Sequence, residues 1–174
     1  MGHPVHPATV HFPITFTILS GLLDIFYAAA TNSTTGPLIL SALKKADVNI
    51  YLATIPILSY YTNILAIVTA VPSVITGIAQ LMPLVQRDGV KTPKALTGIA
   101  HAALNDLVVF GNVYNAWTRR TTTDYKPEPL NIVISGAVTF PMVLISAYLG
   151  ANLVYKYGMG VGGPSGNSKL KKVQ

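Results

Sequence analysis

The sequence contains no cysteine and few charged residues. Without cysteine the chain cannot form disulfides, thiolate metal sites, iron–sulfur clusters or a c-type haem attachment. Charged residues make up 10% of the chain and hydrophobic residues 51%, whereas a soluble domain carries about 25% charged residues. This composition leaves too little polar surface for a soluble protein. It predicts an integral, multi-pass membrane protein whose first partner is the lipid bilayer.

Motifs of several common enzyme classes are also absent. The chain has no Rossmann or P-loop glycine pattern, no Gly-x-Ser-x-Gly and no His-Glu-x-x-His. The net charge of +6 is spread over connecting segments and the C-terminal tail, without a basic helix face or stacking aromatics. We therefore expect no nucleic-acid partner. No catalytic residue is predicted, and the sequence does not decide whether the protein is an enzyme.

Long apolar runs organise the rest of the chain. The length of 174 residues indicates a single domain. A spanning helix needs about 20 mostly apolar residues, and four segments meet that length, at roughly 9–30, 56–85, 95–117 and 130–156. We predict an all-α fold, a four-helix transmembrane bundle over residues 1–158, followed by a disordered basic tail over residues 159–174.

Four spans place both termini on the same side of the membrane. That side carries seven Lys and Arg residues, and the opposite side carries five. Because positive charges collect on the side from which the chain inserts, this small excess favours termini in the cytosol or the mitochondrial matrix. The distribution of Lys and Arg does not indicate which organelle contains the protein.

Three of the four histidines lie within the first thirteen residues, among prolines. Pro4 and Pro7 disfavour helix in the residue before each of them, so His3 and His6 are expected on an extended lead-in. His11 follows Thr9, a residue type that caps helices, and is expected in the first turn of the first span.

The fourth histidine, His101, lies about six residues inside the third span. At a rise of 1.5 Å per residue, His11 and His101 differ by only about 5 Å in depth. The sequence therefore predicts that all four histidines meet at one end of the bundle.

Polar residues in the third span recur at spacings of three and four. Gly98, His101, Asn105, Asn112 and Asn115 fall on one helical stripe, which must face the bundle interior because its exposure to lipid would be costly. For the asparagines we favour interhelical hydrogen bonding, a common role of polar residues in membranes. His101 differs because an ionisable group inside a span is a functional candidate.

Two acids lie within predicted spans. Asp24 shares a stripe with Thr17 and Ser20, turned by more than 100° from His11, and lies about 20 Å deeper than His11. We interpret it as an interfacial acid solvated by headgroups, with proton handling as the alternative. Asp106 lies beside the histidine stripe, and a polar contact within the bundle is expected for it.

Three segments resemble a known family. Residues 2–14 read GHPVHPATVHFPI, residues 101–105 read HAALN, and residues 153–161 read LVYKYGMGV. These stretches resemble the DUF2231 family of predicted integral membrane proteins. At residues 70–77 the likeness is lower, because Ser73 and Gln80 stand where the family pattern leads us to expect a glycine and an acid.

The resemblance implies a four-helix membrane domain with a histidine-rich end. It implies no settled activity, although some bacterial members of the family occur with cytochrome-type domains.

Three functions remain open for the histidine cluster. The first is b-type haem held between the first and third helices, with His11 and His101 as axial ligands. Gln80 and Asn105 would then orient a ligand, and Tyr155 would reach a propionate. Such a protein would transfer electrons, with a quinone or a donor or acceptor protein as its partner.

The second possibility is a non-haem Zn, Cu or Fe site formed by His3, His6, His11 and His101. The third is a cofactor-free structural or assembly subunit, in which imidazole N–H groups bond carbonyls that the prolines leave free. In each case the chain could be a homo-oligomer or one subunit of a larger complex.

Overall fold

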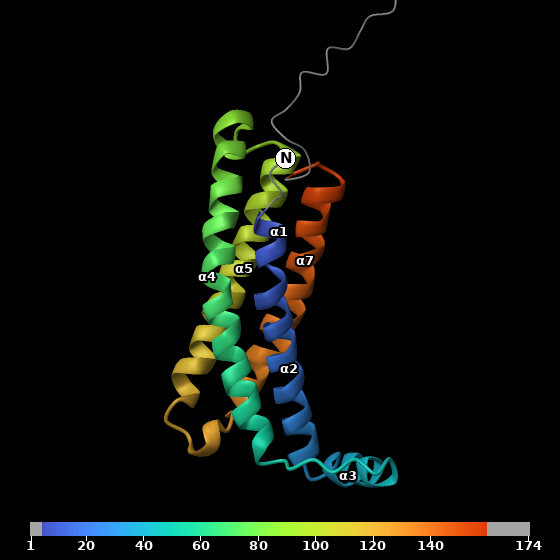
Figure 1. Cartoon of the computed structure of the whole chain (residues 1–174). Coiled ribbons are helices and arrows are strands. Elements are labelled where there is room, and N and C mark those ends of the chain that lie inside the picture. The colour runs from blue at the N-terminus through green and yellow to red at the C-terminus, as the bar shows by residue number, and fades with distance from the viewer. Residues whose placement is uncertain (1–4, 160–174) are drawn as a thin grey trace, which may run out of the picture.

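The computed structural model describes residues 5–159, and every regular element in that part of the chain is helical (Figure 1). The elements in chain order are α1 (Val5–Thr9), α2 (His11–Thr31), α3 (Gly36–Lys45), α4 (Thr54–Asp88), α5 (Pro93–Arg119), the 3₁₀ helix η1 (Thr123–Tyr125), α6 (Pro129–Ile132), the π-helix η2 (Val133–Thr139) and α7 (Phe140–Tyr155). The predicted tail falls almost entirely outside the described residues.

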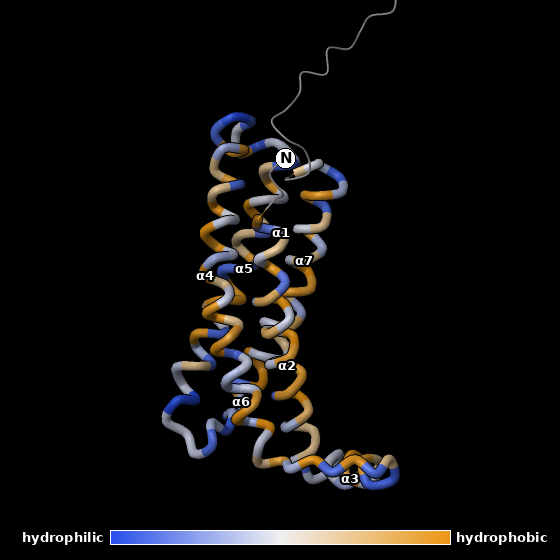
Figure 2. The backbone as a smooth tube through the Cα atoms, in the orientation of Figure 1, coloured by the Kyte–Doolittle hydropathy of each residue, from blue (hydrophilic) through white to orange (hydrophobic). Residues whose placement is uncertain are grey.

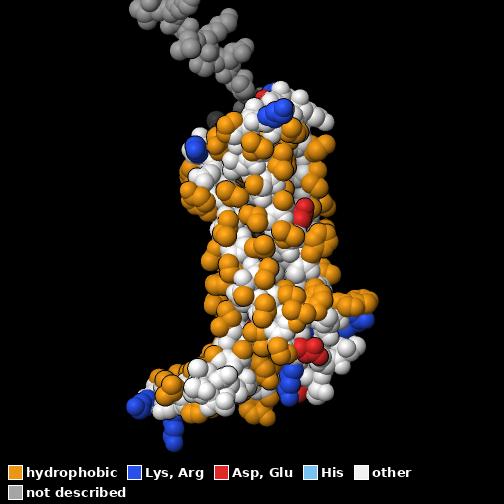
Figure 3. Space-filling view, turned by 180° about the vertical axis from the view of Figure 1, so that it is seen from behind, with side chains coloured by type: hydrophobic (Ala, Val, Ile, Leu, Met, Phe, Trp, Pro, Cys, Tyr) orange, Lys and Arg blue, Asp and Glu red, His pale blue; other side chains and the backbone are white. Residues whose placement is uncertain are grey.

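The long helices α2, α4, α5 and α7 run alongside one another, and α3 projects sideways at one end (Figure 1). Hydrophobic residues cover their outer surface, and hydrophilic residues collect at the two ends (Figures 2 and 3). Three segments are long and apolar enough to cross a membrane: Val5–Thr31, Thr54–Asp88 and Thr123–Tyr155. These three segments support the prediction of an integral membrane protein. The passage of α5 through the bilayer stays a prediction.

The composition of α5 explains why it differs from the other three. It carries the polar stripe of the third predicted span, and Gly98, Asn112 and Asn115 on that stripe are buried, as predicted. Asp106 lies on the other side and is exposed, so the expectation of a contact inside the bundle is wrong for it. Polar groups on both faces lower the mean hydropathy of α5 below that of a simple span.

The first span begins earlier than predicted. Residues 5–9 form helix rather than an extended lead-in, and Val10 continues the same right-handed backbone into α2. Pro7 occupies the third position of α1, where the missing N–H has no intrahelical acceptor to lose. Pro13 lies inside the continuous helix, where its missing N–H leaves the Thr9 carbonyl oxygen without its usual backbone donor. Thr9 does not cap α2 but donates its hydroxyl to the His6 carbonyl oxygen at 2.9 Å.

This continuity puts one polar stripe along the whole span. His6, Pro13, Thr17, Ser20 and Asp24 follow one another at helical spacing, and the last three are buried. The core itself is made mainly of small and polar side chains. Gly21 lies so close to η2 that an added Cβ would meet the Ser135 carbonyl oxygen at 3.0 Å.

Two of the prolines shape the long helices differently. Pro72 lies inside α4, which continues through it to a total of 35 residues. Pro141 is the second residue of α7, which begins directly after the seven-residue π-helix η2. Since proline supplies no N–H and crowds the carbonyl of the preceding turn, the wider π-turn before it relieves that clash.

Candidate functional site

Two histidines meet near the N-terminal end of the described chain. His6 of α1 and His101 of α5 have ring centres 6.3 Å apart and ring planes at 87° to each other. Both side chains are half-buried. They are 95 residues apart in sequence, and the prediction that distant histidines converge at one end of the bundle holds for this pair.

Each imidazole contacts the same two groups on a neighbouring helix, a serine carbonyl oxygen and a glycine. His6 Nδ1 lies 3.0 Å from the Ser73 carbonyl oxygen in α4, and His101 Nδ1 lies 2.8 Å from the Ser146 carbonyl oxygen in α7. Four residues after each serine stands a glycine. A Cβ on Gly77 would meet His6 Cε1 at 3.0 Å, and a Cβ on Gly150 would meet His101 Cε1 at 3.0 Å. The glycines therefore form notches that admit the rings.

These contacts determine which nitrogen of each ring carries a proton. A carbonyl oxygen only accepts hydrogen bonds, so Nδ1 must be the donor in both rings. In the neutral imidazole, Nε2 is then left with a free lone pair. For His101 this lone pair faces the Asn105 amide nitrogen at 3.1 Å. Backbone-anchored Nδ1–H with an available Nε2 is the arrangement of histidines that bind metals.

The sequence predicted His11, rather than His6, as the partner of His101. His11 is exposed at the start of α2, and the ring beside His101 is that of His6. Because the helix is continuous, five residues turn His11 about 140° away from His6. The error follows from the lead-in: an extended segment would have left His6 outside the bundle and made His11 the first interior histidine.

The other predicted site residues are spread over the same end. Asn105 also donates to the His101 carbonyl oxygen at 2.9 Å, so its amide lies against the imidazole. Gln80 is half-buried on α4, and Tyr155 is 89% exposed at the end of α7. His3 lies outside the described residues. Within residues 5–159 no group of three or more His, Cys, Asp or Glu side chains could hold a metal ion.

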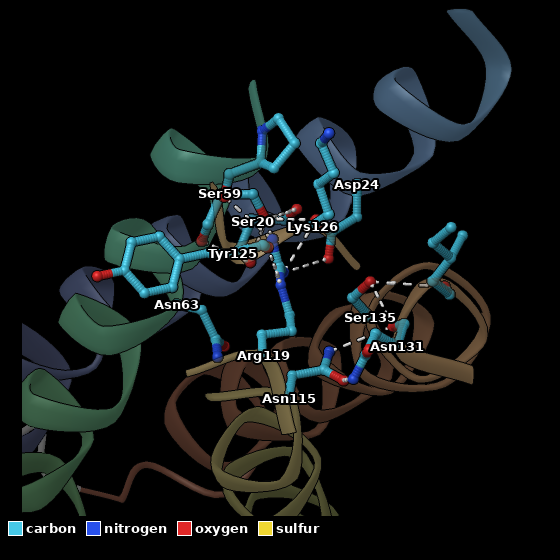
Figure 4. A network of polar contacts seen from close by, with 12 residues as sticks. Ser20, Asp24, Ser59, Asn63, Asn115, Arg119, Tyr125, Lys126, Asn131 and Ser135 are labelled. Atoms are coloured by element: carbon cyan, nitrogen blue, oxygen red, sulfur yellow. Dashed lines mark hydrogen bonds and ion pairs between the residues drawn. The ribbon is translucent and has the colours of Figure 1, made fainter. Parts of the chain in front are cut away.

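A second polar centre lies near the opposite end of the helices (Figure 4). Arg119, the last residue of α5, donates from Nη1 to both carboxylate oxygens of Asp24 at 3.1 Å, and neither side chain is exposed. The interpretation of Asp24 as a headgroup-solvated acid is therefore wrong. Ser59 of α4 also donates to Asp24 Oδ1, at 2.5 Å.

Arg119 ties three separate segments together. Its Nη2 donates to the Pro56 carbonyl oxygen at 3.0 Å, and its Nε donates to the Tyr125 carbonyl oxygen at 2.9 Å. The guanidinium thus binds α2, the first turn of α4 and the connection after α5 in one network. Charge-assisted bonds of this kind satisfy a buried cation almost completely, which suits a structural clamp.

Neutral polar contacts connect the middle of the helices. The Asn112 amide donates to Thr17 Oγ1 at 3.0 Å, and the Asn63 amide donates to the Asn112 carbonyl oxygen at 2.8 Å. Asn115 and Asn131 exchange hydrogen bonds between α5 and α6. Interhelical hydrogen bonding was predicted for the asparagines of α5, and the side chains of Asn112 and Asn115 make such bonds. The prediction is wrong for Asn105, whose amide bonds His101 in the same helix.

Comparison with known proteins gives a family but no characterised relative. No curated protein and no solved structure matches the chain. The family described as "Predicted membrane protein (DUF2231)" matches residues 2–163, which include both histidines of the pair, the buried ion pair and all the helices. Three apolar spans agree with that description, and the chain belongs to the DUF2231 family of predicted membrane proteins.

Proposed function

We propose that the protein is a membrane electron-transfer subunit in which His6 and His101 would hold a b-type haem between α1 and α5. The proposal depends on one observation, the pair of imidazoles with ring centres 6.3 Å apart. His6 replaces His11, which is exposed, as the first ligand.

The separation of the rings favours a shared metal. A metal–imidazole bond is about 2.0 Å long, and the ring centre lies about 1.1 Å behind the bonded nitrogen, so two imidazoles on opposite sides of one metal have ring centres about 6 Å apart. Two ligands suffice for haem iron, whereas a tetrahedral site needs three or four protein ligands. The pair therefore suits haem better than zinc.

The chain supplies the rest of the site from its own residues. The Ser73 and Ser146 carbonyls fix the ring orientations, and the Asn105 amide would give up its bond to His101 Nε2 when a metal takes that lone pair. Haem held by these two histidines would supply one-electron chemistry between a reduced donor and an oxidised acceptor. A quinone or a second redox protein remains the expected partner.

The optical spectrum of the purified protein tests the proposal. Protein from haem-replete membranes is expected to show a Soret band and, after dithionite, a sharp α-band. His6→Ala and His101→Ala should each lose at least nine-tenths of the bound haem, since each removes an axial ligand. His11→Ala is the matched control, because it removes an exposed histidine five residues away, and it should keep the wild-type spectrum.

The remaining outcomes distinguish the other functions. Wild-type protein without a Soret band, but with stoichiometric zinc, copper or iron that the same two variants lose, would replace haem by a non-haem metal. Protein free of both would leave the imidazoles as hydrogen-bond donors to the two serine carbonyls, the role expected of a structural or assembly subunit.

We also propose that α5 crosses the bilayer as a fourth span. It has 27 residues, or about 40 Å at helical rise, and contacts both α4 and α7. Single cysteines at Lys91 and Thr121, which are exposed on either side of α5, should react with an impermeant maleimide from opposite sides of the membrane. Labelling of both from the same side would show that α5 does not cross.

A further inference from the structure

Helix α3 projects sideways from one end of the long helices (Figure 1). It spans Gly36–Lys45, directly after the span that ends at Thr31. Its residues are largely exposed, including Leu38 at 71% and Leu40 at 43%. Ten residues extend only about 15 Å, so α3 cannot cross a bilayer.

The corner between α2 and α3 fixes this direction. A Cβ on Gly36 would meet the Ala30 carbonyl oxygen at 2.6 Å, so only glycine allows so close an approach. Thr35 Oγ1 donates to the Ala29 carbonyl oxygen at 2.6 Å, and Asn32 Oδ1 accepts from the Thr34 N–H at 2.9 Å. The side chains of the turn thus bind back onto the end of α2, and the angle of α3 is built into the fold.

The sequence of α3 gives it two faces. At about 100° per residue, Leu38, Ile39, Leu40, Ala42 and Leu43 share one broad arc, and Ser41, Lys44 and Lys45 share the other. Basic side chains on this arm lie at its far end and on the side away from the long helices (Figure 3). A short helix with an apolar face and lysines on the other is typical of segments that lie in the membrane interface.

We infer that α3 lies in the headgroup layer of the bilayer, with its apolar arc toward the acyl chains and Lys44 and Lys45 toward anionic headgroups. Because α3 projects sideways from the end of α2, its axis runs along the membrane surface once α2 crosses the bilayer (Figure 1). The inference does not depend on haem.

The position of α3 also fixes the depth of the histidine pair. His6 and Thr31 are 25 residues apart, or about 38 Å along a continuous helix. The hydrocarbon core is about 30 Å thick. With α3 in one headgroup layer, the imidazoles lie at the level of the opposite headgroup layer, within reach of groups dissolved in the aqueous phase.

The chain offers a clean test because it contains no cysteine. Ser41→Cys and Ala42→Cys introduce single thiols at neighbouring exposed positions that differ only in the face of α3 they occupy. Each is labelled with a polarity-sensitive fluorophore in nanodiscs containing phosphatidylcholine with or without phosphatidylglycerol. Leu58→Cys, on the outer surface of α4 and 53% exposed, provides the lipid-facing reference.

The label at position 42 is expected to emit like the reference label at position 58. A lipid spin-labelled near its headgroup should quench the label at position 42 at least threefold more than the label at position 41. Phosphatidylglycerol should be enriched around the wild-type protein. Lys44→Gln combined with Lys45→Gln should remove this enrichment. Equal, water-like emission from positions 41 and 42 would overturn the inference. An unchanged lipid enrichment in the double variant would overturn the role of the lysines.

Discussion

Asparagine in place of Asp24 is expected to destabilise the protein by about 3–5 kcal/mol, because it leaves the Arg119 guanidinium buried without a counter-charge. The substitution keeps the size of the side chain and changes only its charge. Neither partner is exposed, so water cannot replace the lost interaction. The measurement is the unfolding midpoint in a mild detergent titrated with SDS, compared with wild-type protein in the same micelles.

The chain provides a matched control for this prediction. Asp106→Asn makes the same chemical change on the exposed face of α5 and should leave the midpoint almost unchanged. Combining Asp24→Asn with Arg119→Gln should recover part of the loss, since the double variant no longer buries an unpaired charge. If Asp24→Asn behaves like Asp106→Asn, the ion pair does not stabilise the fold.

Alanine in place of Asn131 is expected to cost roughly 2–4 kcal/mol, because three partners lose their hydrogen bonds to its side chain. The Asn131 amide donates to Asn115 Oδ1 at 3.0 Å and to Thr118 Oγ1 at 2.7 Å. Its Oδ1 accepts from the Glu128 N–H at 2.9 Å, which caps α6. The loss should appear as a lower thermal midpoint of the detergent-solubilised protein.

Asn49→Ala serves as the comparison, because Asn49 is exposed between α3 and α4 and should tolerate the change. The variant Asn115→Ala should lose a similar amount to Asn131→Ala, and the double variant should lose less than the sum, since the two residues share one interaction. Additive losses would mean that the two asparagines act independently.

The sequence was sufficient to predict which faces of the helices are buried. Polar residues on an otherwise apolar helix must face protein, so the spacing of His101, Asn112 and Asn115 identified the inner face of α5 without knowledge of its neighbours. The same spacing placed Thr17, Ser20 and Asp24 on one stripe of α2, and all three are buried, although Asp24 was predicted to be solvated by headgroups.

The partners of these residues could not be read from spacing. Asp24 and Arg119 are 95 residues apart, and Arg119 follows the end of the apolar run, where a loop residue is the natural expectation. His6 was placed on an extended lead-in because proline disfavours helix in the residue before it. In the structure residues 5–9 are helical, and Pro7 near the helix start costs no hydrogen bond, since the N–H groups of the first turn have no intrahelical acceptor. The repeated serine and glycine, four residues apart in α4 and α7, were a visible signal of the two imidazole notches.

The stripe from His6 to Asp24 has a consequence for how the chain tolerates change in length. Both polar centres depend on one uninterrupted helix, in which each additional residue rotates everything beyond it by about 100°. A single inserted residue near Thr17 would leave His6 facing His101 but turn Asp24 away from Arg119. The first span should therefore accept many substitutions on its outer surface and yet no insertion or deletion, because its length in residues sets the phase between its two ends.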